Sequence, residues 1–503
     1  MTHNSFIEQR PYQLDDFSKW LGIDVSKAKN ILQRLILAGI VRPFQKDKQN
    51  GWQDDALHGE FISGDIGQDT RFVFTYVGVI EIDGHAIKCY PKFMKKEEPK
   101  PSDLRPILQA VERYHAEHTD LDTAIEDSSL RMPNQLAMAL SLLRDYLTYG
   151  LYTNQLEELT LHGQGEIDWE TTINTTMPVI QNNRPYYFDY YTNDTRQDDT
   201  DYISRLHACV ITECSKRLQI SELDEILQLE TPTPYLGERD DFGTDEYIIQ
   251  RLTKEMNVQF ASRKQMLLRN LRVWIENTKL ATDSSGIRMF GTNSFHTLWE
   301  AMCADVFVSQ YKDTLKSLGI TLDNEKFNGD DTLESLIKKP MWQATKNGQP
   351  NGEAHPAKDT LRPDFISIIM KNSHAHFVIL DAKYYDITLN EKDVSGQPGV
   401  EDVNKQYLYH LAYSRFIKAH ALTAINAFVS PTDENKSYVA GTATMPIFAY
   451  IEKDDLTSPI KVVKLSASTV LNSYIAHTHL QLYEEVEELF LDPQALDESD
   501  GEK

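Results

Sequence analysis

Two aspartates and a lysine lie in and beside two short apolar runs of the segment PDFISIIMKNSHAHFVILDAKYY, residues 363–385. Charged side chains seldom lie among buried strands without a partner or a function. The apolar runs are rich in β-branched and aromatic residues, and KNSH between them suits a turn, so the pattern predicts an antiparallel hairpin. The charged residues are Asp364, Asp381 and Lys383.

The register of this hairpin decides whether the charged groups meet. With the turn centred between Asn372 and Ser373, Asp364 lies opposite Asp381. Directly opposed Cβ atoms of antiparallel strands are about 4.5–5.5 Å apart. Side chains alternate along a strand, so Asp381 and Lys383 share one face. The sequence therefore predicts two adjacent carboxylates with an ammonium group one step along.

Two carboxylates this close repel each other unless a proton or a cation intervenes. Hard oxygen ligands suit Mg²⁺, which keeps several waters for a phosphate and a nucleophile. Such an ion polarises a phosphodiester, promotes formation of hydroxide and stabilises the leaving oxygen. Lys383 would either help to deprotonate or orient the attacking water, or offset charge in the transition state. We expect Mg²⁺ as the cofactor, with Mn²⁺ as a substitute.

Two predicted helices flank the hairpin. Upstream, NSFHTLWEAMCADVFVSQY is strongly amphipathic and contains Glu300. Downstream, VNKQYLYHLAYSRF places Gln406 and two tyrosines near one helical face. Each residue has another interpretation when taken singly. Glu300 would be a surface residue of an amphipathic helix, Gln406 a solvated residue, and the two aspartates turn caps.

The order of these motifs resembles the PD-(D/E)xK nuclease core, in which Pro-Asp is followed after a hairpin by Asp-x-Lys. Such nucleases often carry a metal-binding Glu on the helix before the core sheet and a Gln/Tyr helix after the Asp-x-Lys strand. The resemblance implies catalytic roles for Glu300, Asp364, Asp381, Lys383 and Gln406. It implies metal ligands at Glu300, Asp364, Asp381 and Ala382.

A narrower resemblance covers most of the chain, from about residue 70 to about residue 430. YVGVIEIDGHAIKCYPKF resembles the N-terminal signature of McrC-type proteins, FHTLWEAM matches the position of their helix Glu, and LRPDF with ILDAKYY matches their nuclease core. GQGEIDWETTIN fits the LlaJI-like branch.

This resemblance implies a Mg²⁺-dependent DNA endonuclease subunit of a McrBC/LlaJI-like restriction system used in phage defence. The enzyme would be a type II/IV-like restriction endodeoxyribonuclease. Its implied partners are double-stranded DNA and a McrB-like AAA+ GTPase ring that translocates DNA, and the subunit would stimulate hydrolysis by that ring. The sequence itself contains no GxxxxGK[ST] phosphate loop, so the chain is not expected to be a P-loop NTPase.

The N-terminal segment YQLDDFSKWLGIDVSKAKNILQRLILAGIVRP predicts a helix, a tight turn and a second helix. Strands that alternate around an Asp83-Gly84 turn follow. We expect a winged-helix-like segment that runs into a small β unit. Lys27, Lys29 and Arg34 are its candidate DNA contacts. The alternative is that the segment packs against other parts of the protein or against a partner.

The charged, Pro-containing stretch KKEEPKPSDLRP predicts a connector, after which helical patterns dominate. LHGQGEIDWETTINTTMPVIQNNRPYYFDYYT, between two of these patterns, is turn-rich and strand-like. We expect a mixed α/β, multidomain fold. Its parts are a winged-helix-like segment plus β unit (1–94), a largely helical middle domain for partner docking (107–280), a PD-(D/E)xK nuclease domain with a mixed sheet flanked by helices (281–480), and an acidic C-terminal tail (481–503).

Composition excludes several classes of protein. A hydrophobic content of 41% in 503 residues can fill real cores, and the net charge of −25 argues against non-specific coating of nucleic acid. No apolar stretch approaches the roughly 18 residues of a membrane span, and the first residues lack the pattern of a secretion signal. Four cysteines do not make a disulfide framework in so long a chain. We expect a cytoplasmic protein with no membrane partner.

Two other functions use the same features. A stand-alone DNA repair or recombination nuclease would have the same core, although the large N-terminal half has no helicase motif. A non-catalytic adaptor that regulates a AAA+ ring would not need to keep all four charged site residues. The hairpin from Val77 to Phe93 either projects and contacts the ring or covers the edge of a core.

Overall fold

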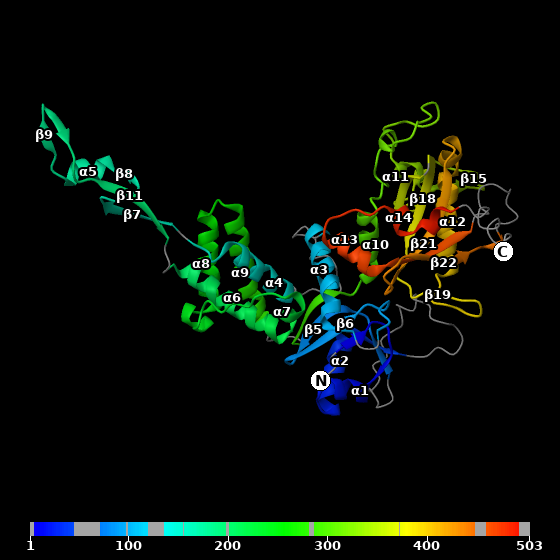
Figure 1. Cartoon of the computed structure of the whole chain (residues 1–503), viewed down its shortest axis with the longest axis horizontal. Coiled ribbons are helices and arrows are strands. Elements are labelled where there is room, and N and C mark those ends of the chain that lie inside the picture. The colour runs from blue at the N-terminus through cyan, green and yellow to red at the C-terminus, as the bar shows by residue number, and fades with distance from the viewer. Residues whose placement is uncertain are drawn as a thin grey trace, which may run out of the picture. The chain divides into compact units, whose positions relative to one another are not determined.

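The computed structural model describes nine stretches of the 503-residue chain. Two compact units emerge: unit 1 comprises Met1–Gly78, Lys88–Glu126 and Gly291–Lys503, and unit 2 comprises Val79–Ile87 and Asp127–Phe290. Figure 1 shows the elements of both. The described stretches are 5–44, 71–96, 99–118, 135–153, 155–197, 201–280, 286–371, 373–447 and 459–491.

Unit 1 begins with the predicted helix–turn–helix. Helix α1 (Leu14–Leu21) ends at Gly22, whose left-handed backbone (φ 66°) suits glycine, and Asp24 caps α2 (Val25–Leu37) by accepting the Lys27 N–H at 3.0 Å. Three short strands complete this segment as a sheet in the order β2-β4-β3. They are β2 (Tyr12–Gln13), β3 (Val41–Phe44) and β4 (Arg71–Phe74).

The predicted hairpin at Asp83-Gly84 is present. Strands β5 (Val77–Ile82) and β6 (His85–Tyr90) join through a turn in which both central residues have positive φ, 50° and 78°, as a type I′ turn requires. The four-stranded sheet has the order β1-β6-β5-β12, with β1 at Ser5–Ile7 and β12 at Ile287–Thr292. Every residue of β5 is buried. The hairpin is therefore part of a core, and of the two alternatives for it the structure favours the one in which it covers the edge of a core.

Helix α3 (Pro101–His118) replaces the second half of the predicted connector. Pro101 is its first residue, where a missing backbone N–H costs little. Pro106 removes one hydrogen bond inside the helix, and packing on α10 and α13 offsets that loss. The Arg113 guanidinium lies 3.0 Å from the Asp305 carboxylate of α10. The compact units thus cut across the predicted boundaries, because α3 packs in unit 1.

Unit 2 contains a helical part, as the periodic apolar patterns predict. The buried Glu81 carboxylate of β5 binds Arg217 of α6 and Arg288 of β12, each at 3.1 Å. The helices are α4 (Gln135–Tyr149), α6 (Tyr202–Ile220), α7 (Leu223–Leu227), the 3-10 helix η2 (Arg239–Phe242), α8 (Asp245–Val258) and α9 (Ser262–Leu280).

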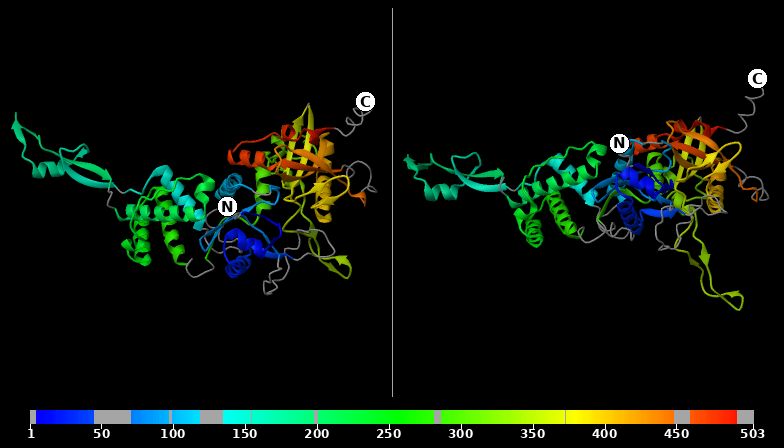
Figure 2. Two further views of the ribbon diagram at one scale, coloured as in Figure 1. Left: turned by 60° about the horizontal axis from the view of Figure 1, so that its bottom comes forward. Right: turned by 90° about the horizontal axis from the view of Figure 1, so that it is seen from below.

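A narrow β-arm, residues 155–197, also belongs to unit 2, and it remains slender in each view of Figures 1 and 2. The predicted turn-rich, strand-like stretch forms most of it. Helix α5 is the exception, and Asp168 caps it by accepting the Thr171 N–H at 2.9 Å. The elements are β7 (Gln155–Leu161), β8 (Glu166–Ile167), α5 (Trp169–Thr175), β9 (Val179–Gln181), β10 (Arg184–Tyr186) and β11 (Tyr191–Gln197).

The C-terminal part of unit 1 is a mixed five-stranded sheet in the order β17-β18-β21-β23-β22. The three central strands are parallel and both edge strands are antiparallel to their neighbours. Figure 1 shows α12 on one side of the sheet and α10 with α13 on the other. The strands are β17 (Phe365–Lys371), β18 (His374–Ala382), β21 (Thr423–Thr432), β22 (Tyr438–Ala443) and β23 (Ile460–Ser466); the helices are α10 (Phe295–Val306), α12 (Val400–Ala419) and α13 (Ala467–Ile475).

The β17–β18 hairpin has the predicted register. Phe365 pairs with Leu380 and Lys371 pairs with His374, and one further step places Asp364 opposite Asp381. Alternate residues of the two strands pack on the aromatic side chains of α12. This apolar packing fixes the register, because a slip of one residue would turn all of these apolar side chains away from α12.

The remaining elements are short. Between α10 and β17 lie η3 (Leu315–Ser317), α11 (Leu333–Leu336) and an exposed double hairpin, drawn yellow-green in Figure 2, of β13 (Met341–Trp342), β14 (Thr345–Lys346), β15 (Gln349–Pro350) and β16 (His355–Pro356). The β19 (Thr388–Leu389) and β20 (Val394–Ser395) strands pair after β18.

The start of the predicted acidic tail is folded. Helix α14 (Leu482–Glu485) and η5 (Glu487–Phe490) bury Leu482 and Leu489, and the Lys461 ammonium donates to the Leu489 carbonyl at 2.7 Å. Residues 492–503 lie outside the described part. All four cysteines are buried and unbridged, as expected. None of the described helices is long and apolar enough to span a membrane.

Candidate active site

Asp364 and Asp381 lie side by side where β17 begins and β18 ends. Asp381 is only 4% exposed, and Asp364 Oδ2 accepts the Ala382 backbone N–H at 2.8 Å. Burial, the charges of Asp381 and Glu300, and a hydrogen bond with Asp381 raise the pKa of Asp364 to about 8. The pair therefore holds more negative charge than its surroundings tolerate, and a proton or a cation relieves it.

Lys383 is held between two carboxylates. Its Nζ lies 2.7 Å from Asp381 Oδ2 and 3.0 Å from Asp402 Oδ1. Burial by itself would lower the pKa of Lys383, but Asp381 and Asp402 together raise it above the usual lysine value. Lys383 is thus an ammonium ion in this arrangement. Of its two anticipated roles, offsetting negative charge is favoured over taking a proton from water.

Asp402 is a site residue that the sequence reasoning missed. It lies in the first turn of α12, where an acidic side chain is favoured by the helix dipole, and the Tyr385 hydroxyl donates to its other oxygen at 3.3 Å. It lies one residue before the start of the predicted helix, and its spacing of four residues from Gln406 was the available signal.

Glu300 joins the site from α10. It is half-buried, and burial raises the pKa of its carboxyl; the Lys383 charge opposes this shift and the Asp381 charge adds to it. The structure therefore brings Glu300, Asp364, Asp381 and Lys383 into one electrostatic group, from segments separated by more than 60 positions in the sequence.

Gln406 makes its hydrogen bonds with residues outside this group of charged side chains. Its side chain is fully buried, and its Nε2 donates to Asn426 Oδ1 at 2.6 Å, to the Ala427 carbonyl at 3.2 Å and to the Ile379 carbonyl at 3.3 Å. These bonds fasten α12 to β18 and β21. They give Gln406 a structural role, and its predicted catalytic role stays a prediction.

The predicted DNA contacts lie on α2. Lys27 is exposed and pairs loosely with Asp24 at 3.9 Å, while Lys29 and Arg34 are half-buried. These three residues stay predicted DNA contacts.

Asp364 and Asp381 provide some, but not all, of the ligands that a divalent ion needs. No group of three or more His, Cys, Asp or Glu side chains in the described stretches already surrounds one metal position. Mg²⁺ needs fewer protein ligands, since it keeps several waters and is commonly held by one or two carboxylates. Asp364 and Asp381 supply that minimal set. The Ala382 N–H donates a hydrogen bond to Asp364. Ligation of the metal by Glu300 or by Ala382 stays a prediction.

Comparison with known families places the chain in a class of proteins. Residues 76–468, well over half of the chain, match a family model, and the class it defines is that of restriction endonucleases. The protein belongs to the LlaJI restriction endonuclease family. The predicted family resemblance is confirmed, and the match extends beyond the predicted end near residue 430.

Individual relatives were also found. The chain is 27% identical over 423 residues to the type II restriction enzyme BsuMI component YdjA of Bacillus subtilis (strain 168), covering 82% of each protein. Among solved structures, a chain of the half-complex of Thermococcus gammatolerans McrB AAA+ hexamers with bound McrC is 13% identical, with 94% of this chain and 98% of that chain covered and a TM-score of 0.36. A chain of the McrBC complex from the same organism is 15% identical over 55% and 79%, with a TM-score of 0.22. Both TM-scores are low.

Proposed function

We propose that this protein is the Mg²⁺-dependent DNA endonuclease subunit of a McrBC/LlaJI-like restriction system, with a PD-(D/E)xK-type core. The observation that carries the proposal is the juxtaposition of Asp364, Asp381 and Lys383 at the end of one hairpin, with Glu300 beside them. Two carboxylates that need a cation, next to an ammonium, are the groups that hydrolysis of a phosphodiester requires.

Each site residue has a definite task in this proposal. Asp364 and Asp381 would hold the ion, and the Ala382 N–H fixes the orientation of Asp364. A bound Mg²⁺ supplies Lewis-acid chemistry, which polarises a phosphodiester and acidifies water. Lys383 offsets the negative charge that grows on the phosphorus centre in the transition state. Asp402 keeps Lys383 charged and directed at the site.

Cleavage of plasmid DNA in the presence of the partner ring tests the catalytic part. Asp381→Ala or Lys383→Ala should lower the Mg²⁺-dependent rate at least about 100-fold, because each removes a group at the reacting centre. Lys346→Ala is the matched control, since this lysine lies on the exposed strand β14 of the same unit. Undiminished cutting by both site variants would refute the assignment.

The partner in this proposal is a McrB-like AAA+ GTPase ring. Support comes from the family resemblance, from a relative that is named as a component of a restriction enzyme, and from the lack of a phosphate loop in this sequence. The subunit would stimulate nucleotide hydrolysis by the ring and cut the DNA that the ring moves.

We infer that the β-arm, and not the buried β5–β6 hairpin, is the surface that contacts the ring. It exposes large apolar side chains that are unusual on a free surface, among them Met177 at 94% and Phe188 at 70% exposure. Others are Trp169, Ile173, Val179 and Ile180.

A pull-down and a nucleotide-hydrolysis assay with the AAA+ protein encoded beside this chain test the contact. The double variant Met177→Ser/Phe188→Ser should weaken binding at least about tenfold and reduce stimulation of hydrolysis, because exposed anchors carry interface energy. Leu236→Ser is the matched control, as Leu236 is 96% exposed in unit 2 outside the arm. Equal binding by the arm variant and the control would exclude the arm as the contact.

A further inference from the structure

A second lysine lies in line with Lys383 across the sheet. Lys383 continues the β18–β21 ladder through its N–H, which donates to the Val429 carbonyl at 2.8 Å, so it is level with Ser430. Ser430 in turn pairs with Lys464 of β23. Residues level with each other in parallel strands point to the same face, so Lys383 and Lys464 share a face, two strand spacings or roughly 10 Å apart.

Lys464 is buried without a partner. The residue is 5% exposed, and within the part of the chain that the structure describes its ammonium makes no hydrogen bond or ion pair. Burial lowers the pKa of Lys464 to about 8; Asp386 and Glu434 oppose that shift and Lys95 adds to it. Burial of a cation without a partner costs stability, and an anion that enters beside the Lys464 ammonium would offset that cost.

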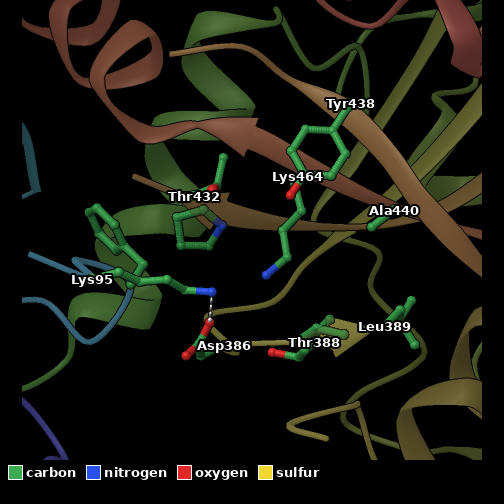
Figure 3. A pocket seen from close by; sticks show the side chains of 11 residues that line it. Lys95, Asp386, Thr388, Leu389, Thr432, Tyr438, Ala440 and Lys464 are labelled. Atoms are coloured by element: carbon green, nitrogen blue, oxygen red, sulfur yellow. Dashed lines mark ion pairs between the residues drawn. The ribbon is translucent and has the colours of Figure 1, made fainter. Parts of the chain in front are cut away.

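The Lys464 side chain ends in a small pocket. Figure 3 shows it reaching from β23 toward the Lys95–Asp386 ion pair, whose charged atoms are 3.6 Å apart. The cavity measures about 140 Å³, which leaves room for a group of five heavy atoms such as phosphate. The Thr388 and Thr432 hydroxyls also line it.

The charge of the lining favours an anion. Of its charged residues, Lys95 and Lys464 are positive and Asp386 is negative, which leaves one positive charge. Asp386 is already neutralised by Lys95. Glu434 lies outside the lining, where it accepts the Tyr438 hydroxyl at 3.1 Å, so that hydroxyl is not free to donate to a ligand.

We propose that this pocket, with Lys464 as its anchor, binds a backbone phosphate of the DNA a few nucleotides from the phosphate that is cut. The inference rests on the proposed nuclease function and adds a positioning residue to it. Because one strand of DNA rises only 3.4 Å along the axis per phosphate, roughly 10 Å between the two lysines keeps the two phosphates within a few nucleotides of each other. A second anchored phosphate would fix the position of the first at Asp381 and Lys383, as a small misplacement costs much of the rate.

Binding of duplex DNA to the full-length chain measures this contact. The Asp381→Ala background prevents cutting, and anisotropy of a labelled 25-base-pair duplex is followed at several low salt concentrations. Lys464→Gln should weaken binding about tenfold and reduce the slope of log K against log salt by about 0.9, the effect of losing one phosphate contact. Lys436→Gln is the matched control, because this exposed lysine lies between β21 and β22 but does not line the pocket.

A scan with single methylphosphonates, which remove one phosphate charge at a time, locates the contact. At one position the methylphosphonate should weaken DNA binding by the chain that retains Lys464. The same methylphosphonate should have no effect on DNA binding by Lys464→Gln. Lys464→Met tests folding, since replacing a partnerless buried cation should leave the melting temperature equal or higher while binding falls.

The outcomes separate the inference from the proposed function. Equal DNA affinity and salt slope for Lys464→Gln and the control would overturn the pocket assignment even if Asp381 proves essential for cutting. If every site variant still cuts DNA, the proposed nuclease function is refuted. A position-specific methylphosphonate effect would still establish the pocket in that case. If inorganic phosphate raises the melting temperature of wild type but not of Lys464→Gln, and DNA binding is unchanged, the pocket takes free phosphate and the DNA assignment is overturned.

Discussion

The Lys383 ammonium lies 3.0 Å from Asp402 Oδ1, which joins the end of strand β18 to the first turn of helix α12. Both partners of this ion pair are half-buried, with 17% and 15% of the two side chains exposed. It leaves Lys383 with two carboxylate partners, of which only Asp381 is a candidate metal ligand. In the proposed reaction Asp402 would therefore act through Lys383, as a positioning residue.

Asp402→Asn should lower the cleavage rate about tenfold with little change in folding, because Lys383 keeps Asp381 but loses its second anchor. Asp402 raises the pKa of Lys383, so its removal should move the alkaline limb of the pH–rate profile to lower pH. Glu401→Gln, an exposed neighbour in the same helical turn, serves as the control. A lower rate with an unmoved alkaline limb would mean that Asp402 only supports the fold.

Mg²⁺ should raise the melting temperature of the protein, and more so at pH 8 than at pH 6. The pKa of Asp364 is raised in the folded state, so the metal-free fold binds an extra proton and loses stability as pH rises from about 4, the unfolded value, to about 8. A cation at Asp364 and Asp381 cancels that loss.

Asp364→Asn should make the metal-free protein more stable at pH 8 and should reduce the gain from Mg²⁺. Thermal melts of both proteins, with EDTA or with Mg²⁺, give the comparison. Asp330→Asn controls for loss of an acidic charge at an exposed site. The same Mg²⁺ shift in wild type and in Asp364→Asn would show that this pair does not hold the ion.

His207 should make the stability of unit 2 depend on pH. Its side chain is buried in α6, its Nδ1 accepts the Tyr152 N–H at 3.0 Å, and burial lowers its pKa to about 4. The unfolded chain binds a proton near pH 6.5 and the folded one does not, so stability is full above pH 6.5 and falls as pH drops toward 4. The loss amounts to roughly 3 kcal/mol at most.

Urea unfolding between pH 4.5 and 7 measures this effect. His207→Asn, whose side-chain oxygen can still accept the Tyr152 N–H, should flatten the dependence of the unfolding free energy on pH. The comparison uses slopes, since the smaller side chain also leaves a cavity. Parallel slopes for the two proteins would rule out His207 as the titrating group.

The purified protein should cut DNA poorly by itself at physiological salt. Phosphate contacts by Lys and Arg supply most non-specific affinity, and a net charge of −25 opposes the approach of DNA. A McrB-like ring with its nucleotide should restore cutting by holding DNA at the site. Efficient cutting by the lone subunit, with no binding to the ring, would favour a stand-alone repair or recombination nuclease.

Local sequence patterns determined the parts of the site that lie close together in the chain. Apolar alternation and a polar turn set the β17–β18 register, which brings Asp364 opposite Asp381, and the Asp83-Gly84 turn was equally clear. Periodic apolar residues located the helices that carry Glu300 and Gln406. Such features depend on neighbours within a few residues, so they can be predicted from a single sequence.

Tertiary packing alone decided the rest. The burial of the β5–β6 hairpin, the continuation of α3 through Pro106, the ion pair of Lys383 with Asp402, and the alignment of Lys383 with Lys464 were not visible in the sequence. Each depends on which segments meet after long connections. Parallel strands such as β18, β21 and β23 are joined by long connections, of which the one from β18 to β21 contains α12, and no local pattern specifies which residues become level across them.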